Sequence, residues 1–215
     1  MQSYLNKANI ARSTNQAEYH PLKPCLDSDT KVLFLGSFPP PLKKWSKGFN
    51  FFYPNFINDH WRIMGIIFYN NKDYFVDTLN KTFYYDKVVS FTQKFHIGYY
   101  DTAQVVKRLK NNASDKFLEI VEGTNIIKLL AKAPNCSHII TTGEKATQAI
   151  CDTMHIEIFP KIGQDIAQPI QFDDKMRNIT LHRLPSSSRA YPLSIEKKAN
   201  IYRNTLLNIL QPDIP

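Results

Sequence analysis

Short apolar runs alternate along the chain with segments in which apolar residues recur at helical spacing. Three runs predict strands: residues 31–36 (KVLFLG), 137–142 (SHIITT) and 178–184 (NITLHRL). Helices are predicted near Ile57 and over residues 102–109, parts of 116–133, 144–153 and from 193 onward. We therefore expect an α/β fold of three layers, with helices on both faces of a mostly parallel central sheet. Residues 31–35 and 137–141 should be inner strands of that sheet.

Two segments interrupt this alternation. Residues 1–30 are polar and predict an N-terminal arm, followed by a single domain over residues 31–215. Residues 37–56 (SFPPPLKKWSKGFNFFYPNF) form a loop, because their prolines exclude regular structure. Loops of this length are usually functional or disordered, and the many aromatic residues here argue against disorder. Residues 71–92 give no clear pattern.

Composition indicates an ordinary globular protein, with 43% hydrophobic and 21% charged residues. The formal net charge of +8 makes nucleic acid a candidate partner without establishing it. Cys25, Cys136 and Cys151 form no CxxC pair, which indicates a reduced protein without a disulfide framework or zinc knuckle. No apolar run approaches the roughly 20 residues that span a bilayer. The N-terminus has no apolar signal segment either, so we expect a cytoplasmic protein without a membrane partner.

Three loops follow predicted strands and should open on one edge of the sheet, where open α/β sheets bind their ligands. They are Gly36-Ser37-Phe38-Pro39, Thr142-Gly143-Glu144-Lys145 and Leu184-Pro185-Ser186-Ser187-Ser188-Arg189.

Four segments carry a resemblance to a known family: KVLFLGSFPP, FFYPNFINDHW, HIITTGEKA and LPSSSRAYPLSIEKKANIYRNTL. In order and spacing they resemble the uracil-DNA glycosylase superfamily, from about residue 31 to 210. The branches they resemble most are the mismatch-specific uracil/thymine and the hypoxanthine-DNA glycosylases. The resemblance implies a monomeric, monofunctional DNA-repair hydrolase that needs no metal or cofactor. It would flip a deaminated or mismatched base, uracil or hypoxanthine, out of DNA and cleave its glycosidic bond with water.

The resemblance also assigns the residues that would hold the base. These are Gly36, Ser37, Phe38, Phe52 and Tyr53. Tyr53 would stack on the flipped base, with Phe52 as its neighbour. The alternative is that Tyr53 is a core aromatic residue in front of a helix.

Asn58 is the first catalytic candidate, because an amide can both accept a hydrogen bond from water and donate one to a carbonyl. Asn55 and Asp101 are further candidates. The structural alternative for Asn58 and Asp101 is helix capping. His182 is either a packed strand residue or a group that stabilises the leaving base.

Several residues would contact DNA: Pro185, Ser186, Ser187, Ser188, Arg189 and Lys145. The serine-rich loop would fill the minor-groove gap left by the flipped base. The alternative is a turn that caps the last helix. Lys43, Lys44 and Lys47 form either a clamp on the DNA backbone or a solvated charged run.

Some positions depart from the family pattern. Phe38 stands where the mismatch-specific branch has a catalytic Asn, and Leu184 where many relatives have Asn or His. Phe56 and His60 replace the Pro and Phe of the hypoxanthine branch. A DNA-binding module without activity is therefore an alternative function. A nucleotide-binding enzyme is disfavoured, because no glycine-rich phosphate motif follows the first strand. A thiol hydrolase is disfavoured as well, because Cys136 and Cys151 lie in or beside predicted core elements.

Overall fold

The computed structural model describes residues 16–109, 117–172 and 175–210. Its central sheet has five strands, which in spatial order are β5 (Ile97–Asp101), β2 (Val32–Gly36), β8 (His138–Thr142), β10 (Lys175–Leu184) and β9 (Asp165–Phe172). The first four run parallel, and β9 pairs antiparallel with β10 at one edge. The expected mostly parallel sheet is confirmed, with β2 and β8 as inner strands.

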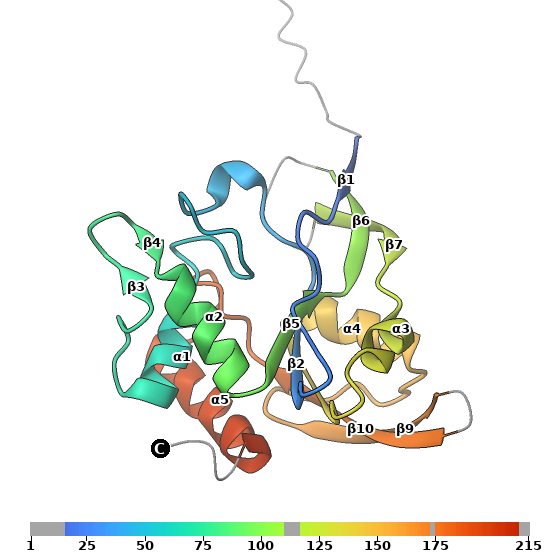
Figure 1. Cartoon of the computed structure of the whole chain (residues 1–215). Helices are drawn as coiled ribbons and strands as arrows, with labels where there is room; N and C mark the ends of the chain where they lie inside the picture. Colours follow the sequence, from blue (N-terminus) through green and yellow to red (C-terminus); the bar gives the residue numbers. More distant parts are fainter. Residues whose placement is uncertain (1–15, 110–116, 173–174, 211–215) are drawn as a thin grey trace, which may run out of the picture.

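Helices cover both faces of this sheet (Figure 1). One face carries α1 (His60–Tyr69), α2 (Tyr85–Lys94) and α5 (Ile195–Leu210), and the other carries α3 (Ile126–Ala131) and α4 (Glu144–Thr153). Every residue of β2 is buried, because apolar side chains meet helices on both sides of the strand. The three expected layers are therefore present.

A second, antiparallel sheet lies beyond the carboxyl ends of β2 and β5 (Figure 1). Its strands, in order, are β1 (Ala17–Tyr19), β6 (Ala103–Arg108) and β7 (Leu118–Gly123). A short 3-10 helix, Leu42–Lys44, lies in the long loop, and β3 (Val76–Asp77) pairs with β4 (Thr82–Phe83). The second sheet brings the N-terminal arm to the edge where a site is expected.

Two helix predictions are wrong. Residues 102–109 form strand β6 instead of a helix, because β1 and β7 pair with its two edges. Residues 116–133 contain strand β7 and only a short helix, α3. The helix predicted near Ile57 begins at His60, and the helix predicted over 144–153 has those bounds.

Aromatic residues make up 13% of the chain, and many of them lie in the core. Trp61 is fully buried and donates a hydrogen bond from Nε1 to the carbonyl oxygen of Phe52 at 3.0 Å. That bond fixes the backbone of the long loop to α1. Cys136 and Cys151 are buried free thiols, as the sequence suggested. No helix in the described part of the chain is long and apolar enough to cross a membrane.

Candidate active site at the carboxyl edge of the sheet

Gly36 and Asp101 end the neighbouring strands β2 and β5 and lie side by side. The Thr102 N–H donates to the carbonyl oxygen of Gly36 at 2.8 Å, and the Ala103 N–H to that of Ser37 at 3.2 Å. The Asp101 side chain lies so close to the Gly36 Cα that a Cβ there would overlap Oδ1. Glycine is therefore required at position 36, because the carboxylate occupies the space of a side chain.

Aromatic rings surround this carboxylate. The His20 ring centroid lies 4.7 Å from that of Tyr100, 5.4 Å from that of Phe38 and 6.2 Å from that of Phe52. His20 Nε2 donates to Asp101 Oδ2 at 2.8 Å. The carboxylate acceptor thus lies beside a cluster of aromatic rings that are themselves almost buried: Phe38 is 8% exposed, Phe52 4% and Tyr100 7%. The sequence analysis did not identify His20, because it lies in the polar arm and outside every matched segment.

Tyr53 is anchored differently from its neighbour Phe52. Its backbone has a φ of 53°, a left-handed conformation that needs support from surrounding contacts in a residue other than glycine. Its ring stacks on His60 with centroids 3.7 Å apart and planes at 9°, and its hydroxyl shares a 2.8 Å hydrogen bond with Thr142 Oγ1. One face of the Tyr53 ring is thus covered. Phe52 is the member of this pair whose ring lies near His20 and Tyr100, with centroid distances of 6.2 and 6.3 Å.

The His60 ring packs against one face of the Tyr53 ring. It is fully buried, and its Nε2 lies 3.0 Å from the Tyr99 hydroxyl. Burial lowers the pKa of His60 well below its ordinary value, so the ring is neutral. A neutral imidazole can stack on Tyr53 without placing a charge in the core.

Asn58 and Asn55 shape the turn before α1. Asn58 Oδ1 accepts the His60 N–H at 2.9 Å, and Asn55 Oδ1 accepts the Ile57 N–H at 3.2 Å. Asn58 precedes the N-cap residue Asp59, so this contact belongs to the turn and is not the helix cap that was its structural alternative; its catalytic role stays a prediction. For Asp101 the capping alternative is wrong, because the residue ends a strand and no helix follows it.

The serine-rich loop, residues 184–189, packs against the turn before α1 and against helix α5. The carbonyl oxygen of Ser187 accepts the Asp59 N–H at 3.0 Å, and that of Pro185 accepts the Tyr202 hydroxyl at 2.8 Å. Thr142, which contacts Tyr53, pairs with Leu184 at the end of β10. The segment around Tyr53 and the serine-rich loop therefore lie together at one edge of the sheet.

An ion cluster lies beneath this loop. Asp59 Oδ1 accepts Arg189 Nε at 2.9 Å, and Lys198 Nζ lies 3.7 Å from Asp59 Oδ2 and donates to the Ser188 carbonyl oxygen at 2.7 Å. The Lys198 side chain is 1% exposed and that of Arg189 is 51% exposed. A cleft of about 650 Å³ adjoins the cluster; Arg62 and Lys72 also line it. Arg189 is thus held through Nε of its guanidinium group, while about half of its side chain is exposed.

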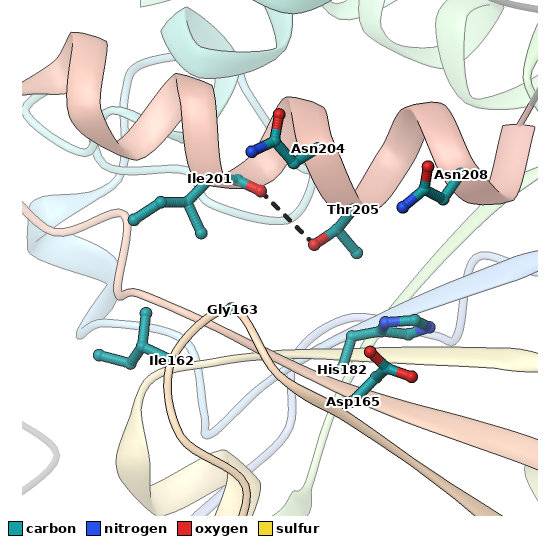
Figure 2. A pocket seen from close by; sticks show the side chains of 8 residues that line it. All are labelled: Ile162, Gly163, Asp165, His182, Ile201, Asn204, Thr205 and Asn208. Carbon is teal, nitrogen blue, oxygen red and sulfur yellow. Dashed lines mark hydrogen bonds between the residues drawn. The ribbon is translucent and has the colours of Figure 1, made fainter.

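The remaining candidates lie elsewhere. Lys145 donates to the Leu118 carbonyl oxygen on β7, whereas Lys43, Lys44 and Lys47 are exposed on the long loop. His182 lines a cavity of about 240 Å³ beside α5 (Figure 2), and none of the other candidate residues lines it. Its Nε2 shares a 3.0 Å hydrogen bond with His138 Nδ1, and burial and His138 lower the pKa of His182 to about 4. His182 is therefore a packed strand residue in this structure.

Neither a protein-family model nor a curated protein matches the sequence. The structure is similar to the solution NMR structure of a candidate uracil DNA glycosylase from Methanosarcina acetivorans, with a TM-score of 0.52 and 20% sequence identity. The match covers 85% of this chain and 94% of that chain. At this identity the similarity concerns the fold, and it shows that the chain has a uracil-DNA glycosylase-like fold.

Proposed function

We propose that the protein is a monofunctional DNA glycosylase that excises a deaminated or mismatched base, uracil or hypoxanthine. One observation carries the proposal: the Asp101 carboxylate lies against Gly36 at the carboxyl ends of two parallel strands, among Phe38, Phe52 and Tyr100. This is the edge where open α/β sheets bind ligands. The fold shared with a candidate uracil DNA glycosylase supports the same proposal.

In the proposed reaction the target nucleotide is flipped out of the duplex, and its base is placed beside Phe38 and Phe52, two nearly buried rings that have to separate to admit it. Water attacks C1′ of the sugar and the glycosidic bond breaks; its electron pair leaves with the base, which then gains a proton. Asp101 is the group proposed to contact the water or an N–H of the base, because a carboxylate accepts hydrogen bonds at both oxygens. Asn58 is the weaker candidate, since its Oδ1 already accepts the His60 N–H.

We attribute the proposed DNA affinity to basic side chains that are exposed to solvent. Arg189 beside the serine loop and Lys43, Lys44 and Lys47 on the long loop would contact phosphates. Ser186 and Ser188 are partly exposed and small enough for the loop to approach the DNA backbone closely, whereas Ser187 is 2% exposed and would reach DNA only if the loop moved.

A single-turnover assay tests the proposal, with duplexes that contain uracil, hypoxanthine, xanthine or mismatched thymine. Asp101→Asn should lower the cleavage rate by roughly 10²-fold or more while duplex affinity changes little. Asn58→Ala is run in parallel, and Asp152→Asn, an exposed carboxylate on α4, is the matched control. If Asn58→Ala is inactive and Asp101→Asn cleaves normally, the assignment of Asp101 is wrong. If the wild type binds duplexes and cleaves none of them, the chain is an inactive DNA-binding module of the same fold.

A further inference from the structure

We propose that residues 17–25 of the N-terminal arm are a component of the active site and that His20 is a positioning residue for Asp101. The inference rests on the glycosylase function proposed above. It concerns the contact between His20 and Asp101, two residues that are 81 positions apart in the sequence.

The contacts of His20 fix its ring completely. The side chain is 3% exposed, and Nε2 donates to Asp101 Oδ2 at 2.8 Å. Nδ1 lies 3.1 Å from the Leu22 N and 2.9 Å from the Leu22 carbonyl oxygen. In a neutral ring Nδ1 accepts the Leu22 N–H, and in a charged ring Nδ1–H donates to the carbonyl. Nε2 carries a hydrogen toward Asp101 in both forms, because a carboxylate only accepts.

The arm that carries His20 is itself held on both sides of this contact. Before it, β1 pairs with β6 from Ala17 to Tyr19, and Glu18 forms a 2.8 Å ion pair with Arg108, whose side chain is 2% exposed. After it, Cys25 and Tyr99 exchange two backbone hydrogen bonds of 3.0 and 2.8 Å. The arm is therefore anchored to β5, whose last residue is Asp101, and to β6, which follows it.

These anchors determine the orientation of the carboxylate. His20 holds Oδ2, so Oδ1 is directed at Gly36, where β2 ends and the loop to Phe38 begins. Without His20 the Asp101 side chain would be free to rotate away from that position. Small errors in the placement of a reacting group lower rates strongly, which makes the orientation of Asp101 a determinant of the reaction.

Two substitutions separate positioning from other roles. His20→Ala removes the donor, and His20→Gln keeps an N–H at a similar place without an imidazole. We expect His20→Ala to lower the single-turnover rate roughly 10- to 100-fold, the effect of losing a hydrogen bond to a charged group. His20→Gln should restore most of the rate, and the duplex Kd should stay unchanged in both. Tyr19→Ala is the matched control, because that neighbouring side chain is 77% exposed.

Three results would overturn the inference. His20→Ala could cleave like the wild type, or His20→Gln could be as slow as His20→Ala, which would indicate proton transfer by the imidazole. The third is a loss of rate that Tyr19→Ala shares, together with a lower melting temperature, which would indicate a structural role.

Binding of free hypoxanthine and free uracil, followed by NMR on the full chain, separates this inference from the proposed function. If the wild type binds a free base but cleaves no duplex, and His20→Ala weakens that binding, the positioning role stands and the glycosylase function falls. If the wild type cleaves DNA and His20→Ala changes neither rate nor binding, the function stands and this inference falls. If the wild type neither binds a base nor cleaves DNA, both fall.

Discussion

Replacement of Asp59 by Ala should destabilise the protein strongly, because this carboxylate is the counter-charge of a buried lysine. The Asp59 side chain is 9% exposed, and it lies 2.9 Å from Arg189 Nε and 3.7 Å from Lys198 Nζ. Without Asp59, the Lys198 ammonium keeps only the Ser188 carbonyl oxygen among the partners described above. Removing one member of a buried ion pair costs about 3–5 kcal/mol, a large part of the roughly 5–15 kcal/mol that stabilises a domain.

Lys198→Met should cost less. The methionine fills a similar volume, Asp59 keeps its contact with Arg189, and the main loss is the hydrogen bond to Ser188, about 1–3 kcal/mol. The double variant Asp59→Ala with Lys198→Met should therefore be more stable than Asp59→Ala alone, because it no longer buries an unpaired charge. Urea unfolding of the four proteins at pH 7 measures this coupling. Additive effects of the two substitutions would refute the reasoning.

The pH dependence supplies a second test of the same contact. Burial lowers the pKa of Lys198 and Asp59 opposes that shift, so Asp59→Ala should lower the pKa further. A lysine with a lowered pKa in the folded state binds fewer protons there than in the unfolded chain, so stability rises with pH between the two pKa values. The penalty of Asp59→Ala should thus shrink as the pH rises from 7 toward about 10, near the ordinary lysine pKa. With Met at position 198 this pH dependence should disappear.

Two further predictions concern the site and the DNA-binding surface. Gly36→Ala should destabilise the fold by about 1–3 kcal/mol and abolish cleavage, because a Cβ would overlap Asp101 Oδ1. A thermal melt measures the first effect and a single-turnover assay the second. A fully active variant would show that the carboxylate is mobile. Duplex affinity should fall steeply with salt, and Lys43→Ala with Lys44→Ala should reduce the slope of log K against log salt by about two, whereas an unchanged slope would place the DNA elsewhere.

The sequence predicted the elements whose pattern has one interpretation. The run VLFLG fits only a strand buried on both faces, and β2 is that strand. The helix over residues 144–153 follows a glycine and carries apolar residues at helical spacing, so its bounds were predictable as well. Local pattern and tertiary environment agree at both places.

Residues 102–109 show why other elements could not be predicted. Ala103, Val106 and Leu109 recur at a spacing of three, which indicates a helix, while the β-branched Val105 and Val106 favour a strand. The pairing of β6 with β1 and β7 decides between the two. β7 is the next strand along the chain, but β1 is distant in the sequence, so the pattern of residues 102–109 alone does not contain the answer.

The same limit applies to the site, and it explains why the sequence favoured Asn58 over Asp101. Asn58 lies in a recognisable motif, but its amide accepts the backbone N–H that opens α1. Asp101 lies outside the matched segments, and its candidacy depends on contacts across the fold: Gly36 on β2 and His20 of the arm, whose ring lies near Phe38 and Phe52 of the long loop. Phe38 stands where the mismatch-specific glycosylases have a catalytic Asn, so the proposed function needs a polar group at this edge from another strand. Asp101 at the end of β5 is next to Gly36 in the sheet register and meets that requirement.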